Sequence, residues 1–272
     1  MDAGEQFQLG QRAAERYEAF VGLFMTPFVH ALIEATDVQP GDVVLDVACG
    51  TGFVTRAVAG RLGPDDRVVG TDINPAMLAI AGRAVGDTVP KVEWRQAPAD
   101  DLPFDDGSFD VVLCQQGLQF VPDLPAALAE VARLLRPGGR FGTTTWASLD
   151  RSPYMAAQYH ALTEALGAGA TESFLGAFSM TAERLRSAAE FAGLTMIDVQ
   201  DVERPIRLPA LPGTAADHLT ALPWGQALVE SGADALAAAA AAITSRLRSH
   251  AAADGVITVP FASLLLTAVR PG

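Results

Sequence analysis

The chain has 272 residues, half of them hydrophobic, and a formal net charge of −13 at pH 7. This length can bury the core of one large domain, and the acidity excludes the positive surface with which proteins bind nucleic acid or anionic membranes. We therefore expect a single domain over residues 1–272, with no nucleic-acid partner and no membrane insertion. A homo-oligomer stays open.

Cysteine usage and the first residues indicate a reducing, cytoplasmic setting. The chain has two cysteines, Cys49 and Cys114, and neither a disulfide framework nor a zinc-type Cys/His spacing. We expect no metal site. Residues 1–10 are acidic and polar, unlike a signal peptide, and no uninterrupted apolar stretch of about 20 residues predicts a membrane span.

The N-terminal segment, Gln6 to Thr36, is predicted to be helical, because large apolar residues recur every three or four positions. Pro27 is expected to kink or split this helix, and Pro40-Gly41 breaks the chain before the first strand. We expect residues 1–40 to form a helical lid.

A strand, a loop of small residues and a helix follow between Val43 and Ala59. Val43 to Leu45 is an apolar run typical of a buried parallel strand. Beyond Asp46 the loop has small residues at alternate positions, namely Ala48, Gly50 and Gly52. Such a loop lets a ligand approach the backbone closely, and the following helix points free N–H groups at it.

The sequence disfavours a dinucleotide as that ligand. Aligned on Ala48 and Gly50, the third small position of G-x-G-x-x-G would be Phe53, and Asp46 would repel a pyrophosphate. The same carboxylate suits a ligand with an ammonium group, such as S-adenosylmethionine (SAM). The loop resembles motif I of the class I SAM-dependent methyltransferases; the alternative is a tight turn with no ligand.

The next strand, Arg67 to Thr71, ends at Asp72, 22 residues after Gly50, which is close to the spacing of about 20 between a glycine loop and a ribose-binding acid. One carboxylate can accept hydrogen bonds from both ribose hydroxyls. Ile73 and Met77 are candidates for packing on an adenine ring, and a plain core role for Met77 is an equal alternative.

Three further strands are predicted at Lys91 to Arg95, Phe109 to Cys114 and Arg140 to Trp146. Five strands alternating with helices predict an α/β doubly wound sheet whose ligand crevice lies outside the carboxyl ends of the strands. Two later strands, Leu194 to Leu208 and Val256 to Val269, make it a mostly parallel seven-stranded sheet. We expect residues 41–146 to form the core, and residues 147–180 and 209–255 to be helical cap insertions.

Five motifs in register resemble the UbiE-like group of class I methyltransferases, named for C-methyltransferases of ubiquinone and menaquinone biosynthesis, with their Rossmann-like fold. They are Leu45–Gly52, Gly70–Leu78, Asp101–Phe104, Phe109–Val112 and Leu135–Gly139.

This resemblance implies a role for each matching residue. The methionyl part of SAM would be held by Asp46 and the backbone of the loop, and the ribose by Asp72. At the position of Pro98 the family usually has an acid that contacts the adenine amino group. Proline cannot make this contact, so either Asp100 replaces the acid or the contact is lost. The implied cofactor residues are Tyr17 (as a lid, against simple packing), Asp46, Ala48, Cys49, Gly50, Gly52, Asp72, Ile73, Met77, Ala99, Asp100 and Gln115.

The predicted function is transfer of the SAM methyl group to O, C or N of a small apolar or aromatic metabolite, with S-adenosylhomocysteine (SAH) as the product. Alignment of the reactants is worth about 7–11 kcal/mol, more than the 10²–10⁴-fold of a general base, so a fixed catalytic triad is not required. We expect an apolar chamber lined by Phe20, Phe24, Met25, Trp146, Tyr154, Tyr159, Phe178 and Trp224.

His160 and His218 are the candidate catalytic bases, against the alternative that each is a surface or packing residue. A SAM-binding protein that no longer transfers methyl groups is the alternative function. A nicotinamide oxidoreductase is disfavoured by Asp46 and Phe53.

Overall fold

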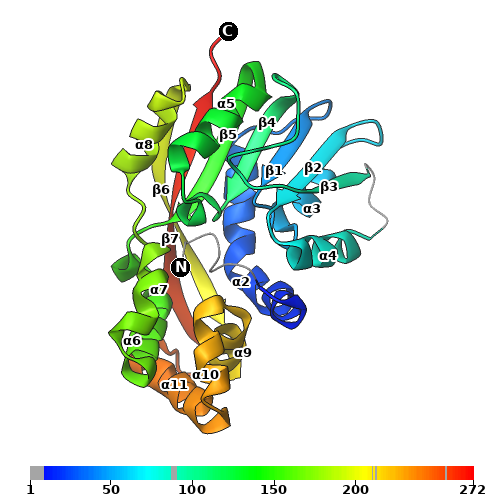
Figure 1. The fold of residues 1–272 in the computed structure, drawn as a ribbon. Coiled ribbons are helices and arrows are strands. Elements are labelled where there is room, and N and C mark those ends of the chain that lie inside the picture. The colour runs from blue at the N-terminus through cyan, green and yellow to red at the C-terminus, as the bar shows by residue number, and fades with distance from the viewer. Residues whose placement is uncertain (1–8, 87–90, 210, 212, 255) are drawn as a thin grey trace.

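Seven strands form one mixed sheet with the spatial order β3-β2-β1-β4-β5-β7-β6 (Figure 1). The computed structural model describes residues 9–86, 91–209, 211, 213–254 and 256–272. Strands β1 to β5 run parallel, and β7 is antiparallel to both of its neighbours, β5 and β6. The strands are β1 (Val43–Val47), β2 (Arg67–Asp72), β3 (Val92–Gln96), β4 (Phe109–Gln115), β5 (Leu135–Trp146), β6 (Thr195–Leu208) and β7 (Ile257–Val269). The predicted fold class is confirmed.

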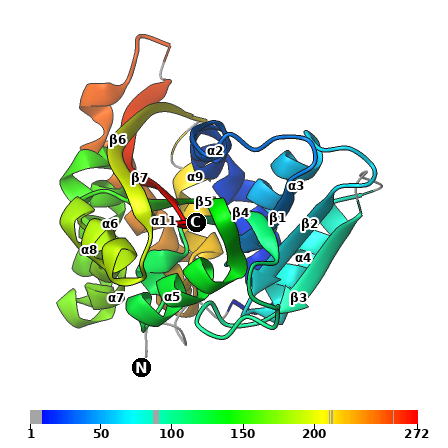
Figure 2. The same ribbon diagram turned by 90° about the horizontal axis from the view of Figure 1, so that it is seen from above.

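Helices cover both faces of the sheet, as the apolar runs of its central strands require. Val44 packs in one apolar cluster with α2 and α3, whereas the next residue, Leu45, packs in another with α5 and α8. Figure 2 shows α2 and α3 on the side of the sheet opposite to α5 and α8. These helices and α4 are α2 (Gln11–Ala35), α3 (Phe53–Ala59), α4 (Pro75–Ala84), α5 (Leu124–Leu134) and α8 (Ala182–Phe191).

Helix α2 belongs to two parts of the structure. Near its C-terminal end Leu32 belongs to the sheet-facing cluster, whereas Tyr17 in its first half and Phe24 near its middle belong to the cap cluster. Pro27 lies inside the helix, which continues through it; of the two effects expected from this proline, a kink or a split, the split is wrong. Packing at both ends holds the two halves in one helix. By length and composition α2 could cross a membrane, but its apolar face is buried within the protein.

The last two strands extend beyond the sheet as a two-stranded ribbon. Strand β7 pairs with β5 only as far as Ser263, opposite Trp146, but continues to pair with β6 until Ile257 lies opposite Leu208. In Figure 1 this ribbon runs from the sheet to the cap helices.

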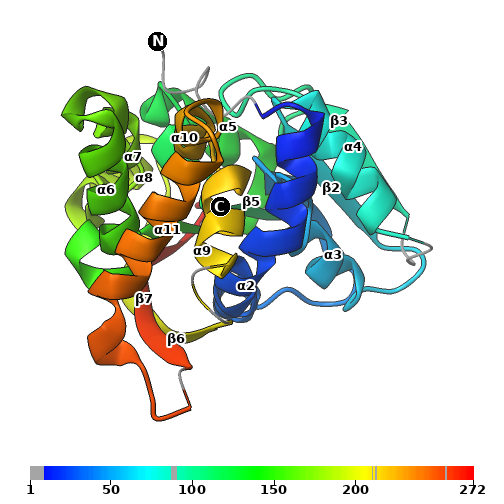
Figure 3. The ribbon, with the colours of Figure 1, turned by 90° about the horizontal axis from the view of Figure 1, so that it is seen from below.

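The cap consists of helices from the two predicted insertions. Figure 3 shows α9 beside α2, so the cap adjoins the N-terminal helix. The predicted insertion 209–255 includes positions 210, 212 and 255, which lie outside the described residues. The cap helices are α6 (Pro153–Leu166), α7 (Glu172–Gly176), α9 (Gly213–Ala221), α10 (Gln226–Glu230) and α11 (Ala233–Arg246). Short 3₁₀ turns are η1 (Leu118–Phe120), η2 (Leu149–Arg151), η3 (Ala168–Thr171), η4 (Pro223–Gly225) and η5 (Arg248–His250).

Candidate cofactor and acceptor site

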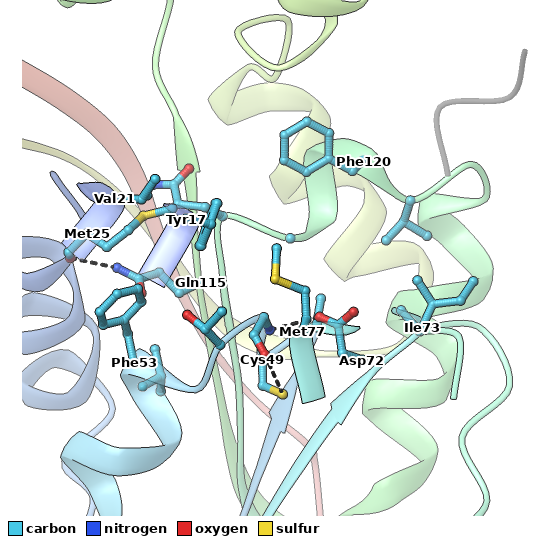
Figure 4. Close-up of a pocket in the computed structure, with 18 of the residues that line it drawn as sticks. Tyr17, Val21, Met25, Cys49, Phe53, Asp72, Ile73, Met77, Gln115 and Phe120 are labelled. Atoms are coloured by element: carbon cyan, nitrogen blue, oxygen red, sulfur yellow. Dashed lines mark hydrogen bonds between the residues drawn. The ribbon is translucent and has the colours of Figure 1, made fainter. Parts of the chain in front are cut away.

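A cavity of about 350 Å³ lies at the carboxyl ends of β1, β2 and β4 and continues beneath α2 to the cap. Figure 4 shows side chains from these strand ends and from α2 around it. Eleven of the predicted cofactor residues line it, namely Tyr17, Asp46, Ala48, Cys49, Gly50, Asp72, Ile73, Met77, Ala99, Asp100 and Gln115. The carboxyl edge of a parallel sheet is where its ligands bind.

Asp46 presents one unused carboxylate oxygen in this wall. Its Oδ2 accepts hydrogen bonds from the backbone N–H of Thr55 at 3.0 Å and from the Thr55 hydroxyl at 2.5 Å. Its Oδ1 is buried and has no hydrogen-bond partner among the described residues. Burial raises the pKa of Asp46 to about 7, because the ionised form lacks solvation. A ligand cation would supply the missing partner.

The loop after Asp46 adopts left-handed backbone at successive alternate residues. Ala48 has φ +53° and Gly50 has φ +56°. For alanine this conformation costs about 1–2 kcal/mol, and strain of this kind is concentrated at functional sites. A Cβ added to Gly50 would meet no atom within 4 Å, so the loop leaves open space at this residue.

Gly52 is the predicted cofactor residue that does not line the cavity. It also has positive φ, +86°, and it precedes α3. A Cβ there would lie 2.8 Å from Cη2 of Trp94, on β3. The left-handed backbone and the close packing against Trp94 of β3 therefore explain this glycine.

Asp72 is held at the tip of β2 by two backbone amides. The N–H of Gly50 donates to Oδ2 and the N–H of Asn74 donates to Oδ1, each at 2.8 Å. Burial raises the pKa of Asp72, and these hydrogen bonds act against that rise. Each oxygen keeps accepting capacity, so the carboxylate is pre-oriented for a pair of hydroxyl donors.

Helix α2 covers the loop and is attached to it by polar contacts. The Gln115 side-chain amide donates to the carbonyl oxygen of Met25 at 3.0 Å, a bond drawn in Figure 4. Arg56, on α3, pairs with Glu18 of α2 at 2.8 Å and also donates to the carbonyl of Thr51. Tyr17 of α2 lines the cavity, and its pKa is raised by burial first and then by the charge of Asp72.

The cap end of the cavity is apolar and aromatic. Of the eight residues predicted to form the chamber, Phe24, Met25, Trp146 and Trp224 line the cavity. The other four do not line it; they are Phe20, Tyr154, Tyr159 and Phe178.

Three of those four pack behind the cavity wall. Tyr154 is fully buried and stacks on Phe24, with ring centroids 5.3 Å apart. Tyr159 and Phe178 both pack against Phe174, at 5.8 and 5.4 Å. They support the lining residues from the far side.

The two candidate bases have different surroundings. His160 is exposed on α6 and does not line the cavity, so it lies away from any ligand there. His218, on α9, is buried and lines the cavity. Its Nδ1 lies 2.8 Å from Nε2 of Gln158 and 3.3 Å from the hydroxyl of Tyr154. Burial lowers the pKa of His218 to about 3, so its ring is neutral at neutral pH.

Some lining residues were missed from the sequence. The Thr51 hydroxyl is buried in the cofactor end without a hydrogen-bond partner among the described residues. Gln116 has φ +53°, and a Cβ on Gly117 would come 2.7 Å from that of Ala48. The Gln-Gln-Gly run after β4 was the available signal for this second turn. No sequence pattern indicated that Met155 lines the cavity, because its helix is apolar on several faces.

Comparisons with known proteins agree with this geometry. A family model described as a methyltransferase domain matches residues 45–143. The nocamycin O-methyltransferase of Saccharothrix syringae is 32% identical, and the match covers 96% of this chain and 97% of that protein. The demethylmenaquinone methyltransferase of Symbiobacterium thermophilum is 36% identical over 49% of this chain and 56% of its own length.

Solved structures share the fold at low identity. The Haemonchus contortus phosphoethanolamine N-methyltransferase 2, bound to SAH, has a TM-score of 0.64 and 19% identity, covering 98% of this chain and 59% of that one. A methyltransferase from Bacillus halodurans has a TM-score of 0.60 and 17% identity, covering 90% and 99%.

The strand order, the small-residue loop and the two buried carboxylates define the class, SAM-dependent methyltransferases with a Rossmann-like fold. Within that class, the relative that matches over the whole chain and the relatives that match only the core are all named as methyltransferases. This chain belongs to the UbiE-like group of class I SAM-dependent methyltransferases. SAM is its cofactor, SAH is the product, and a small molecule is methylated. The nicotinamide alternative is set aside.

Proposed function

We propose that this enzyme methylates an oxygen atom of a small, largely apolar or aromatic molecule. The observation that carries this proposal is the continuity of the cavity, which joins Asp46 and Asp72 to a wall containing Trp146 and Trp224. Among the described residues, the charged side chains lining it are all carboxylates, with no Lys or Arg to hold a phosphate. This lining favours an acceptor without a phosphate group.

The lengths over which the relatives match this chain favour oxygen as the accepting atom. The relative named as an O-methyltransferase matches through the cap as well as the core. The relatives named for menaquinone and ubiquinone biosynthesis match over about half of this chain. Since acceptor specificity lies in the cap, the full-length relative is the better guide.

The cofactor end fits SAM residue by residue. Oδ1 of Asp46 would pair with the ammonium group, and the Thr51 hydroxyl and the backbone of Ala48 to Gly50 would face the methionyl part. Asp72 would hold the ribose hydroxyls. Ile73 and Met77 would flank the adenine, with Ala99 and Asp100 at the ring edge and the backbone of Gln115 near the ammonium group.

When bound, SAM supplies an electrophilic methyl group carried on a positively charged sulfur. The chain's own contribution is to align an acceptor oxygen with that methyl and to exclude water beneath α2. Alignment of this kind is worth about 7–11 kcal/mol, so no strong base is needed for an acidic acceptor.

The test combines binding and turnover. Calorimetry should detect SAM and SAH binding, and methyl-labelled SAM should transfer its label to members of a panel of phenols, enols and carboxylic acids. Mass spectrometry should then find the added CH₂ on oxygen. Binding of SAH without transfer to any acceptor would instead favour the alternative, a SAM-binding protein with another reaction.

Location and assembly stay predictions. We expect the enzyme to act in the cytoplasm without a nucleic-acid partner. Size-exclusion chromatography with light scattering measures whether the chain forms a homo-oligomer.

A further inference from the structure

A buried polar cluster of His218, Gln158 and Tyr154 borders the cap end of the cavity. The imidazole of His218 stacks on Phe24, with centroids 4.4 Å apart, and on Tyr154 at 5.5 Å. These two contacts fix the plane of the ring. Its Nδ1 faces Gln158 and Tyr154, neither of which lines the cavity, so Nε2 is the nitrogen left for a ligand.

The hydrogen bonds around Nδ1 determine which nitrogen of His218 carries the proton. The Gln158 amide nitrogen lies 2.8 Å from Nδ1 and can only donate, so Nδ1 accepts and Nε2 is protonated. The Tyr154 hydroxyl, 3.3 Å away, can donate to the same nitrogen.

The opposite amide orientation is less favourable. Gln158 is fully buried, and in the present orientation its Oε1 has no hydrogen-bond partner among the described residues. Rotating the amide would place its NH₂ group, with two donors, where this oxygen now lies. An unpaired carbonyl oxygen is tolerated in proteins more often than unpaired N–H groups.

We propose that His218 donates a hydrogen bond from Nε2 to an oxygen of the acceptor, with Gln158 as the residue that positions its proton. This inference rests on the proposed function and narrows the substrate class. The acceptor carries a carbonyl or carboxyl oxygen conjugated with the oxygen that is methylated, as in an ortho-acyl phenol, an enolised dicarbonyl or a carboxylic acid.

Conjugation also explains how the acceptor can lose its hydroxyl proton without a base from the protein. A ring protonated at Nε2 presents no lone pair to the acceptor, so His218 does not remove its hydroxyl proton. The acceptor must be acidic enough to lose that proton to solvent. A donor on the conjugated oxygen stabilises the resulting anion, whereas a donor on the attacking oxygen would weaken it as a nucleophile.

The first experiment reads the tautomer directly and needs no acceptor. The chain has four histidines, so a long-range nitrogen–proton correlation spectrum of protein with isotope-labelled histidine is simple, and His218→Gln assigns the signals by their loss. We expect the Nε2-protonated pattern at neutral pH, and its conversion to the Nδ1-protonated pattern in Gln158→Glu, whose carboxylate can only accept. A wild-type ring that is Nδ1-protonated or doubly protonated overturns the proposal.

The second experiment tests whether a bound ligand accepts a hydrogen bond from Nε2 of His218. Calorimetry on SAH-saturated protein compares ortho-hydroxyacetophenone with ortho-ethylphenol, which has the same shape without the carbonyl. We expect the ketone to bind about three- to tenfold more tightly, the effect of one hydrogen bond. His218→Phe should remove this preference while keeping the aromatic stack, and His218→Gln should retain part of it.

The exposed His160 supplies the control, since His160→Gln should leave the preference unchanged. Equal affinities for the two probes, or no binding of the ketone, overturn the substrate class. Failure of SAH itself to bind would instead contradict the proposed function, and the tautomer measurement would still stand.

Discussion

The two carboxylates at the cofactor end, Asp46 and Asp72, differ in how hydrogen-bond donors are distributed over their oxygens. Asp72 has a backbone donor on each oxygen, whereas Asp46 has both of its donors, from Thr55, on one oxygen. Asp72 is therefore oriented before a ligand arrives, while Oδ1 of Asp46 is left for a ligand to pair with. This difference separates the effects expected from the same change at the two positions.

Asp46→Asn should keep the fold and lose the cofactor. The asparagine oxygen can accept both hydrogen bonds from Thr55, and its NH₂ group replaces the unpaired oxygen. The pKa of Asp46 is raised from 3.8 to about 7 by folding, so the folded state holds this proton more tightly. The stability contributed by Asp46 is thus highest below about pH 4, falls as pH rises to about 7, and is constant above.

Thermal unfolding at several pH values checks this expectation. The melting temperature of Asp46→Asn, relative to the original protein, should rise between pH 4.5 and pH 8, because the substitution removes a group that resists ionisation. SAH affinity of the original protein should weaken as pH falls below about 7, since the ammonium group pairs with the ionised form. A variant that binds SAH normally would contradict the role given to Asp46.

Asp72→Asn should weaken SAH binding by about 10- to 100-fold, the value of hydrogen bonds to a charged group. Its amide would also place a donor against the N–H of Gly50 or Asn74, which now meet carboxylate oxygens. Isothermal titration calorimetry measures the affinity. The exposed Asp101 provides the matched control, because Asp101→Asn makes the same chemical change outside the cavity and should leave affinity unaltered.

The loop between β1 and α3 contains two glycines, Gly50 and Gly52, and each is required for a different reason. Gly52→Ala should destabilise the protein by about 1–2 kcal/mol from its left-handed backbone alone, and more from contact with Trp94. Gly50→Ala has a similar backbone penalty but meets no protein atom, so its side chain would occupy ligand space.

Chemical denaturation and calorimetry together separate the two glycine variants. We expect the larger loss of stability in Gly52→Ala and the larger loss of SAH affinity, relative to stability, in Gly50→Ala. The reverse ranking would show that Gly52 contributes to binding and not to packing.

Helix α2 is expected to be stabilised by the cofactor loop beneath it. Arg56→Met removes the ion pair with Glu18 and the bond to the carbonyl of Thr51, so amide hydrogen exchange in residues 11–25 should accelerate. SAH should slow it again. Arg83→Met removes the exposed ion pair with Glu15 and should change exchange little, since such pairs contribute at most about 1 kcal/mol. Equal acceleration in the two variants would contradict a specific link to the loop.

For the whole molecule, the sequence predicted the sheet and its edge but not the interior of the cap. Strand tips such as Asp46 and Asp72 could be assigned to one edge, because parallel strands fix the positions of their carboxyl ends. Helix faces in the cap depend on packing between segments far apart in the chain. Tyr154 and Trp224 are therefore indistinguishable as aromatic residues in the sequence, although Tyr154 lies behind the cavity wall and Trp224 lines it.

The ribbon of β6 and β7 has a consequence for how this enzyme can change. Because Leu208 and Ile257 face each other at its end, the chain leaves and re-enters at one point, where a segment of almost any length can be accommodated. The segment between them carries the cavity residues His218 and Trp224, and its replacement would leave the pairing of β6 with β7 intact. A change confined to this one segment would alter part of the acceptor wall and leave Asp46 and Asp72, at the strand ends, in place.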